Sequence, residues 1–572
     1  MTLITIILMF LGPVLGYMTW SVATLNKNVH KARQLNVPYI CVLVDGNNMF
    51  WAIFQPYVWR ILDRLPFQWS SYPDFIRYSR RGWEYIDGSS THVHLGPVWA
   101  LITPVAVYLQ FADPDAINAI FTRRSDFVRP TKEYKLLEVY GPCVSTAGDD
   151  WARHRRVLAA PFNESIMEFV WNESLRQAGS MLRYWSLAGE SGVPSMQRDT
   201  RTLSLNVLAS AAFRKSYPFH GSNNPRIDEA SNYRDSLQTI LDNIVPLMLI
   251  PYRFLTSPLI PHRWAKVGKA AVSFKEHMAE MLENETKALK DGMPGSGGIM
   301  TAFARALKTH SEETNSSKPS TRIFKKGLSV DEIFGDVFVI NFAGHDTTAV
   351  TLAFTMLLLA ANPPVQEWIS EEISAVTKDI PTEEWDYKSL FPALNRTRAV
   401  LLETLRVYPP IMGLPKWTSQ KAQTISVSGR TFTIPPGVSA VICLKAIQSH
   451  PDYWVDPYAW KPSRWISQTN SVSASSTRVD QHHERLLSPK SNTYFPWSDG
   501  PQKCPGKKFA EVEAVAVLAC LFRQHRIFVK KMTNESDEAA QRRAIACTNN
   551  VTLEALLKMA NADKVTLICN QV

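Results

Sequence analysis

The chain has 572 residues, of which 45% are apolar and 20% charged, and a formal net charge of +10. This composition excludes a disordered polymer, because it supplies enough apolar side chains for a large core. A nucleic-acid-binding protein should concentrate its basic residues on one stripe or helix. Here Lys and Arg are scattered, so we predict no nucleic-acid partner and a surface suited to anionic membranes or an acidic protein.

The seven cysteines are spread over the whole chain, and no two of them form a Cys-x-x-Cys pair. A disulfide-bonded scaffold would be denser in cysteine, so the sequence predicts reduced, cytosolic thiols. The cysteines are Cys41, Cys143, Cys443, Cys504, Cys520, Cys547 and Cys569.

The first 26 residues carry no charged side chain, and the first charges, Lys27, Lys31 and Arg33, follow them. About 20 apolar residues can span a bilayer, and basic residues after the span keep the following domain in the cytoplasm. A cleaved signal peptide would carry basic residues before the apolar run instead. We therefore predict a transmembrane anchor at residues 1–25, a linker and membrane-proximal segment at 26–75, and one large domain at 76–572. The seven N-x-S/T sequons are then chance matches in a cytoplasmic domain.

The first half of the large domain shows mainly helical patterns. A helix is expected to begin near Asp113, and residues 150–290 are mostly helical. The apolar stretch 244–260 is either a core segment or a part that dips into the membrane. Residues 291–298 and 309–322 are polar surface connections.

A long helix is predicted at residues 328–362. Ser329 and Glu332 have the spacing of a capping box, and apolar residues then cover nearly every side of the helix. Asp336, His345 and Asp346 interrupt the apolar run, which favours a central core helix over a membrane span.

The remaining elements are shorter. A helix at 394–410, a strand–turn–strand unit at 431–447 and a strand near the C-terminus are expected, with a low-complexity surface insertion at 467–492. Helices dominate, so the sequence predicts a mainly α fold with small β-sheets.

Cys504 lies in the loop FPWSDGPQKCPGKKF at residues 495–509, just before an amphipathic helix. Free N–H groups at a helix N-terminus favour a thiolate. Gly500 and Gly506 allow a sharp turn or a close approach to another group. These features favour a thiolate ligand to a metal. The alternative is a buried cysteine that behaves as a small apolar side chain.

Three other motifs carry candidate chemistry. AGHDTT places Asp346 beside Thr347 in the long helix, where they could open the helix locally and relay protons. Alternatively, the threonine bonds back to a carbonyl one turn earlier. GDDWARHRR places Trp151 and Arg155 four residues apart, so that an N–H donor and a cation can face one anion. The alternative here is a solvated basic helix face.

The third motif is an ion pair. Glu403 and Arg406 are three apart on a helix and are flanked by apolar residues, which suggests burial. A buried pair needs further partners, and Arg464 in DPYAWKPSRW is a candidate. An ordinary surface pair would contribute little.

In this order and combination the motifs resemble those of the cytochrome P-450 family of haem-thiolate monooxygenases, from about residue 80 to the C-terminus. WSDGPQKCPG is similar to the haem-binding loop of the family, AGHDTT to its oxygen-activation motif and ETLR to its Glu-x-x-Arg pair. WKPSRW is similar to the segment that locks that pair, and WARHR to the haem-propionate helix. The resemblance implies the cytochrome P-450 fold in a single catalytic domain, behind the N-terminal transmembrane helix of microsomal members.

The resemblance also implies residue roles. Cys504 is expected as the axial thiolate on the iron of haem b, where thiolate donation favours O–O cleavage. Asp346 and Thr347 are expected to help protonate bound dioxygen, and Trp151 and Arg155 to hold a haem propionate. The triad behind the haem is expected to consist of Glu403, Arg406 and Arg464.

The cysteine loop departs from the family pattern at two positions. Trp497 stands where the family usually has Phe, and Gln502 where it usually has Arg. Glutamine can donate to a propionate but carries no charge, which puts one charge-assisted contact in doubt. Lys503 is a candidate replacement, although its side chain should point elsewhere. We expect an altered haem affinity or redox potential and no loss of function.

The expected function is a monooxygenase that inserts one oxygen atom from dioxygen into an apolar organic substrate, by hydroxylation, epoxidation or multistep oxidation. The resemblance is to fungal members that make secondary metabolites such as terpenoids or polyketides. The substrate pocket is expected to include the turn 409–415, Phe342, Ala343 and the loop before Trp151. An alternative is a haem-thiolate isomerase or dehydratase that does not use dioxygen; a non-catalytic haem binder and a membrane scaffold without cofactor are weaker alternatives.

No flavin or dinucleotide motif is visible, so electrons are expected from NADPH through a separate cytochrome reductase, with cytochrome b5 as a further candidate donor. The resemblance places the chain in the endoplasmic reticulum membrane as a single-pass protein with a cytoplasmic catalytic domain. A basic face is expected to dock the acidic reductase. Its candidate residues are Lys503, Lys507, Lys508 and Arg523.

Overall fold

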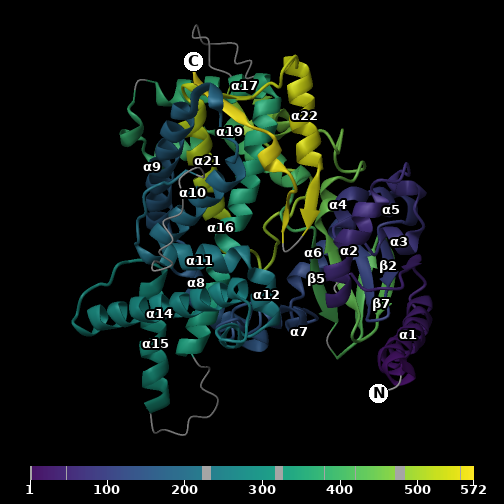
Figure 1. Ribbon diagram of the computed structural model, residues 1–572. Helices are drawn as coiled ribbons and strands as arrows, with labels where there is room; N and C mark the ends of the chain where they lie inside the picture. The colour runs from purple at the N-terminus through teal and green to yellow at the C-terminus, as the bar shows by residue number, and fades with distance from the viewer. Residues whose placement is uncertain are drawn as a thin grey trace.

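The computed structural model describes residues 3–46, 48–221, 233–315, 326–378, 380–418, 420–469, 483–553 and 556–572. Long helices make up most of this part and surround one central helix, α16 (Figure 1). The largest sheet and the short N-terminal helices gather on the right-hand side of the same view. The observed architecture is the mainly α fold with small sheets that the sequence predicts.

The longer helices are α1 (Leu3–Arg33), α2 (Met49–Leu62), α6 (Pro114–Thr122), α8 (Trp151–Ala159), α9 (Glu164–Ala188), α10 (Met196–Phe213), α11 (Tyr233–Asp242), α14 (His262–Lys290), α15 (Ile299–Asn315), α16 (Val330–Ala361), α17 (Pro363–Thr377), α19 (Asn395–Val407), α21 (Lys507–Phe522) and α22 (Asp537–Asn549). The shorter ones are α3 (Asp74–Arg77), α4 (Trp83–Asp87), α5 (Ser90–Leu95), α7 (Thr131–Tyr134), α12 (Ile244–Leu249), α13 (Tyr252–Leu255), α18 (Tyr387–Ala393) and α20 (Leu444–Gln448).

The largest sheet has six strands in the order β1-β2-β3-β8-β5-β4. The strands are β1 (Tyr39–Cys41), β2 (Val98–Ile102), β3 (Val107–Phe111), β4 (Phe127–Val128), β5 (Gly413–Thr418) and β8 (Ser439–Cys443). β1–β2 and β3–β8 are parallel pairs, and the other neighbours are antiparallel. The sheet therefore joins the N-terminal part of the chain to strands from its last third.

Four two-stranded antiparallel sheets complete the described strands. They are β6 (Gln423–Val427) with β7 (Arg430–Ile434), β9 (Ile466–Thr469) with β10 (His483–Leu486), β11 (His525–Val529) with β14 (Leu567–Gln571), and β12 (Val551–Leu553) with β13 (Leu557–Met559). Both strands expected at 431–447 exist, but β7 and β8 belong to different sheets. Most of the expected insertion at 467–492 lies outside the described residues, between β9 and β10.

The central helix α16 begins as the sequence predicts. The side chain of Ser329 accepts a hydrogen bond from the N–H of Glu332, and Glu332 in turn accepts one from the N–H of Ser329. Among the described residues α16 is the single helix long and apolar enough to cross a membrane, yet it is mostly buried among other helices. α16 packs closely on α10 at Gly344, where a Cβ would lie 3.1 Å from the side chain of Leu208 and that side chain would have to shift. α16 is thus the predicted core helix.

The expected linker at 26–75 contains regular structure. Ala32 at the C-terminal end of α1 and Leu35 just after it belong to the apolar cluster of the six-stranded sheet, and β1 forms the edge of that sheet. α2 follows and lies over the outer side of this region (Figure 1). The transmembrane anchor at 1–25 stays a prediction.

The apolar stretch 244–260 contains both buried and exposed side chains. Ile244, Leu247 and Leu255 are buried in the main core, as expected of a core segment. Phe254 and Leu259 are largely exposed, so the expected membrane contact of this stretch stays a prediction.

Candidate active site

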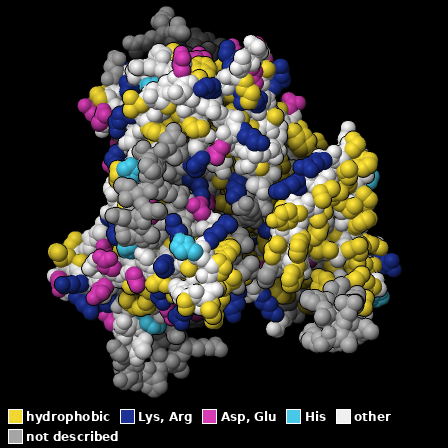
Figure 2. Space-filling view, viewed as in Figure 1, with side chains coloured by type: hydrophobic (Ala, Val, Ile, Leu, Met, Phe, Trp, Pro, Cys, Tyr) yellow, Lys and Arg dark blue, Asp and Glu magenta, His cyan; other side chains and the backbone are white. Residues whose placement is uncertain are grey.

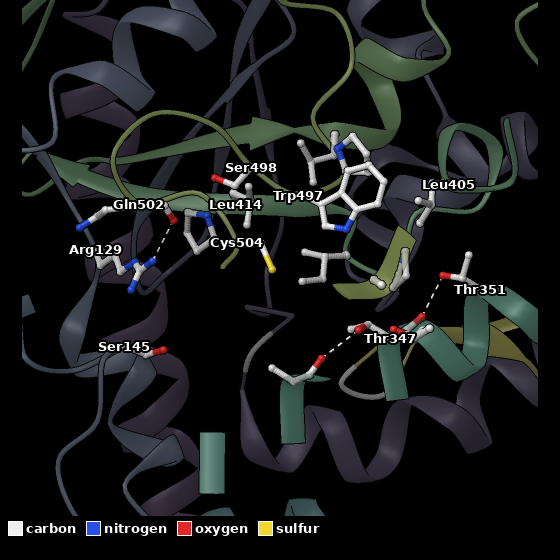
Figure 3. Close-up of a pocket in the computed structure, with 18 of the residues that line it drawn as sticks. Arg129, Ser145, Thr347, Thr351, Leu405, Leu414, Trp497, Ser498, Gln502 and Cys504 are labelled. Atoms are coloured by element: carbon white, nitrogen blue, oxygen red, sulfur yellow. Dashed lines mark hydrogen bonds between the residues drawn. The ribbon is translucent and has the colours of Figure 1, made fainter. Parts of the chain in front are cut away.

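A cavity of about 300 Å³ lies between the cysteine loop and the middle of α16. Figure 3 shows the sulfur of Cys504 pointing into the space between Arg129 on one side and Thr347 on the other. Most of the wall is apolar, and it is built from α16, α19, the turn after α19 and the cysteine loop. Its apolar members include Ala343, Leu401, Leu405, Pro410, Ile411, Leu414, Pro415, Leu444, Pro496, Trp497 and Ala510.

The backbone of the loop fixes the position of the cysteine. The N–H of Cys504 donates to the carbonyl of Trp497 at 2.9 Å. Gly500 has φ +68°, and a Cβ there would lie 2.6 Å from the carbonyl oxygen of Phe121, so only glycine fits. Burial raises the pKa of the Cys504 thiol, while the N–H of Gly506 and the charge of Arg155 act to lower it. A rigid loop therefore presents one sulfur to the cavity.

The opposite wall is a row of threonines on α16. Thr347 donates from Oγ1 to the carbonyl of Ala343 at 2.8 Å, and Thr351 donates to the carbonyl of Thr347 at 2.8 Å. Both residues, together with Thr348, line the cavity. The back-bonding that the sequence offered as an alternative for Thr347 is present, and its hydroxyl still lies on the cavity side.

Asp346 does not line this cavity. Neighbouring residues on a helix differ in direction by roughly 100°, so Asp346 lines a second cavity of about 360 Å³. Its Oδ1 lies 2.5 Å from Nε of Arg201 and 3.1 Å from Nε2 of His345. Burial by itself would raise the pKa of Asp346, but His345 and Arg201 hold it well below its usual range. The structure thus separates the acid and the alcohol of the motif.

Sequence reasoning missed two cations, Arg129 and Lys416. Val128 on β4 pairs with Trp417 on β5, and the continuing register sets Arg129 opposite Lys416 at the cavity wall. Nζ of Lys416 lies 2.5 Å from Oε1 of Gln502, and Arg129 donates to the carbonyl of Gln502 at 3.3 Å. Burial, with the charge of Arg129, lowers the pKa of Lys416 to about 7. The sequence signal that could have revealed this site is Lys416 itself, a lysine in the middle of the mainly apolar strand β5.

Trp151 and Arg155 lie on α8, behind the wall of the cavity. Trp151 is buried, and the guanidinium of Arg124 lies 5.2 Å from its ring centroid. Arg155 is half-buried, and its charge acts on both Cys504 and Arg129. The helix therefore adds a positive charge near the sulfur, although neither residue lines the cavity.

The expected triad assembles around Glu403, which is fully buried. Arg406 donates two hydrogen bonds to it, at 2.8 and 2.9 Å, and Arg464 donates one at 2.9 Å. Trp465 and the N–H of Lys461 fill the remaining acceptor positions. The buried carboxylate is thus fully partnered, which is the condition for tolerating it.

A family model described as Cytochrome P450 matches residues 89–551. The chain belongs to the cytochrome P450 family. The match spans the central helix, the triad and the cysteine loop, and the chain is a cytochrome P450 monooxygenase.

Relatives of this cytochrome P450 extend over nearly its whole length. A monooxygenase of the family from Arthrobotrys oligospora is 28% identical and covers 95% of each chain. One from Penicillium roqueforti is 27% identical over 91% of each chain, and the phomenoic acid biosynthesis cluster member of Leptosphaeria maculans is 27% identical over 92% of each. A crystal structure of a cytochrome P450 (CYP102L1) matches with a TM-score of 0.62 at 16% identity, covering 86% of this chain and 98% of the other. At this identity, the match to the crystal structure shows similarity of the fold alone.

Membership of the family implies a haem with cysteine thiolate ligation, and the residues of the cavity fit that group. Cys504 offers a thiol at the cavity surface, and apolar walls suit a flat macrocycle. Within the described ranges, Arg129, Arg155 and Lys416 make no ion pair with a carboxylate, which suits an anionic group such as a haem propionate. Lys416 supplies a cation beside Gln502, and the candidate Lys503, whose side chain was expected to point elsewhere, is not among the residues that line the cavity.

The residues expected in the substrate pocket do not all line the same cavity. Ala343 and most of the turn 409–415 line the cavity, and Ser145 represents the loop before Trp151. Phe342 was expected there too, but it lines the second cavity beside Asp346, because it lies on the other side of α16.

Proposed function

We propose that this cytochrome P450 inserts one atom of dioxygen into an apolar organic substrate, by hydroxylation, epoxidation or multistep oxidation. The supporting observation is that the sulfur of Cys504 and the hydroxyl of Thr347 face one cavity with mainly apolar walls. Haem b bound through Cys504 would supply the activation of dioxygen, favoured by electron donation from the thiolate.

The chain's own residues would handle protons and substrate. Thr347 holds its hydroxyl at the cavity surface, where it can donate to a bound ligand once its bond to Ala343 breaks. Asp346 would stay ionised on the other side of the helix, paired with Arg201 at the second cavity, because its pKa is low. Arg129, Arg155, Lys416 and Trp151 would fix the propionate side of the haem.

The substrate class follows from the lining. Leu405, Ile411 and Leu414 offer no charge to a substrate, so a largely apolar molecule is favoured. One relative is described as belonging to the phomenoic acid biosynthesis cluster. We therefore propose a role in secondary metabolism, with a terpenoid or polyketide as substrate.

The proposed electron donor is NADPH–cytochrome reductase, with cytochrome b5 as a second candidate. Lys508 is already paired with Glu164 at 2.5 Å, so Lys503 and Lys507 are the freer candidates for docking. Nζ of Lys507 lies 5.3 Å from the ring centroid of Trp497, on the cysteine loop itself. The proposed location is the endoplasmic reticulum membrane with a cytoplasmic catalytic domain.

A carbon monoxide difference spectrum of the reduced holoenzyme tests the proposed ligation. The wild type and the control Cys520→Ala should both give a Soret band displaced far to the red, and Cys504→Ala should not. Retention of that band in Cys504→Ala would contradict the proposal. Substrate turnover without NADPH and reductase would favour the isomerase or dehydratase alternative instead.

A further inference from the structure

A third cavity, of about 340 Å³, lies against the turn after α19. Pro410, Ile411 and Pro415 line both this cavity and the main cavity that faces Cys504, and we call these three residues the shared wall. Ile411 is 41% exposed there, which an apolar side chain covered by protein on both sides would not be. The two cavities therefore have an apolar surface in common.

Strand β5 explains how one segment serves both cavities. Successive side chains of a strand point to opposite faces of the sheet. Leu414 and Lys416 line the main cavity and not the third, whereas Gly413 lines the third cavity and not the main one. The position of the third cavity relative to the main one is thus fixed by the backbone of β5.

Three carboxyl groups line the third cavity, those of Asp45, Glu84 and Glu133. Asp45 is 4% exposed, and its Oδ2 accepts hydrogen bonds from the hydroxyl of Thr103 at 2.7 Å and from that of Tyr108 at 2.9 Å. Thr103 follows β2 directly and Tyr108 belongs to β3. The largest sheet therefore holds one of the three carboxyl groups at a fixed place in the wall.

The carboxyl group of Glu84 lacks a partner on one side. Its Oε2 is buried and has no hydrogen-bond partner among the residues that the structure describes. Burial raises the pKa of Glu84 to about 7, and the charge of Arg81 acts in the opposite direction. Buried polar atoms are normally hydrogen-bonded, so a carboxyl oxygen left open toward a cavity indicates that a ligand supplies the missing donor.

The charges of the wall favour an uncharged donor. Partial burial and the negative charge of Asp45 raise the pKa of Glu133, so an anionic ligand would meet repulsion here. Arg81 lies in the same wall and reduces the attraction for a cation, while Arg80 is already paired with Asp63 at 2.9 Å. A hydroxyl group can donate to a carboxylate without bringing a charge of its own.

Apolar side chains surround these polar groups. The rest of the wall includes Trp83, Leu101, Val441 and Leu553. Figure 1 places α4 and the largest sheet on the right-hand side of the molecule, and Figure 2 shows mostly apolar atoms on that side, with Lys and Arg atoms along its border. A few polar groups that converge in an otherwise apolar cavity are typical of a site that orients a small molecule.

We propose that the third cavity binds the hydroxyl-bearing end of the substrate, and that Asp45, Glu84 and Glu133 select an alcohol over a carboxylic acid. This inference rests on the proposed oxidation of an apolar substrate in the main cavity. The apolar body of the substrate lies across the shared wall, so the position of oxidation is far from the hydroxyl group. The substrate class is thereby narrowed to long amphipathic alcohols.

Equilibrium dialysis of the full-length holoenzyme tests this selectivity. Radiolabelled 1-dodecanol and farnesol are each compared with the matching acid, dodecanoic acid or farnesoic acid. We expect the alcohol of each pair to bind roughly tenfold more tightly than the acid, because like charges repel across a binding surface.

Two charge reversals sharpen the test. Glu133→Lys replaces a carboxylate of the wall by a cation and should bring the ratio of the two dissociation constants to about one. Glu138→Lys is the matched control, since Glu138 lies on the same segment and lines none of the three cavities. It should keep the wild-type ratio.

A third variant, Glu84→Leu, removes the carboxyl group that lacks a partner. It should leave the fold intact and weaken the binding of both alcohols severalfold, because the acceptor for the hydroxyl is lost. Unchanged affinity for the alcohols in this variant would overturn the proposal. Equal affinity of the wild type for alcohol and acid, no saturable binding of either alcohol, or the same ratio in Glu133→Lys and Glu138→Lys would also overturn it.

The proposed function is measured separately in the same samples. Dialysis reports binding without any oxidation, whereas the carbon monoxide difference spectrum and NADPH-dependent turnover report the haem-thiolate centre and its activity. A failed selectivity is therefore distinguishable from a failed enzyme.

Discussion

The hydroxyl of Thr347 is the protic group of α16 that our mechanism uses on the cavity side. Its neighbour Asp346 lies in an ion pair with Arg201 on the second cavity. Proton transfer to a ligand in the main cavity therefore depends more on the hydroxyl of Thr347 than the AGHDTT motif alone indicates.

Thr347→Ala should leave haem binding unchanged and reduce product formed per NADPH by about a hundredfold, the usual contribution of a positioned proton donor. Thr351→Ala is the matched control, because Thr351 makes the same bond to a carbonyl one turn along α16. Product and NADPH consumption would be measured together. Equal losses in the two variants would contradict a special role for Thr347.

Lys416 lies beside Gln502, where it can supply the positive charge that Gln502 lacks. Its substitution by glutamine should speed loss of haem to apomyoglobin by roughly 10- to 100-fold, since a hydrogen bond to a charged group contributes about 1.5–3 kcal/mol. Lys421→Gln, at an exposed lysine, is the control and should behave as wild type. An unchanged rate in Lys416→Gln would show that the cation does not contact the haem.

At the scale of elements, a buried carboxylate joins α8, α16 and the loop before α8. Asp336 is fully buried; Nδ1 of His154 lies 2.7 Å from its Oδ2, and the N–H of Val144 donates to Oδ1 at 2.6 Å. Ser145, the next residue, lines the cavity. The pair therefore positions part of the substrate wall from behind.

Asp336→Asn should lower the free energy of unfolding by about 1.5–3 kcal/mol, because it weakens the buried hydrogen bonds to His154 and the N–H of Val144. It should also weaken substrate-induced spectral shifts, as the loop around Ser145 loses its support. Asp331→Asn, at an exposed position one turn earlier, is the control. Thermal unfolding followed by circular dichroism gives the first quantity and substrate titration the second; unchanged values in both would refute the positioning role.

At the scale of the whole molecule, the triad joins α19 to the segment that carries Arg464 and Trp465. Burial raises the pKa of Glu403, but Arg406 and Arg464 outweigh this and lower it overall. A carboxyl whose folded pKa is lowered stabilises the fold above its unfolded pKa of about 4.3 and loses that effect as pH falls through the folded value.

Glu403→Gln should therefore destabilise the protein by about 3–5 kcal/mol at pH 7 and flatten the stability loss below pH ~4.3. Acid unfolding followed by circular dichroism and haem absorbance measures both effects. Glu190→Gln, at an exposed glutamate, should match the wild type. A variant as stable as wild type at pH 7 would show that the triad is not needed for folding.

Features set by neighbouring residues were predictable from the sequence. The capping box at Ser329, the end of α19 before Pro409 and the cysteine loop before α21 all depend on contacts within a few residues. Their patterns also carry the family resemblance. The glycine at 500 could be inferred as special, although only the fold shows that it meets Phe121.

The tertiary structure alone decided which residues share a cavity. Pairing of β4 with β5 brings Arg129 and Lys416 together across almost 290 positions of sequence. The orientation of α16 separates Asp346 from Thr347. Local patterns fix secondary structure and turns because their interactions are short-range, whereas the direction in which a side chain points depends on packing between distant segments, which no local pattern records.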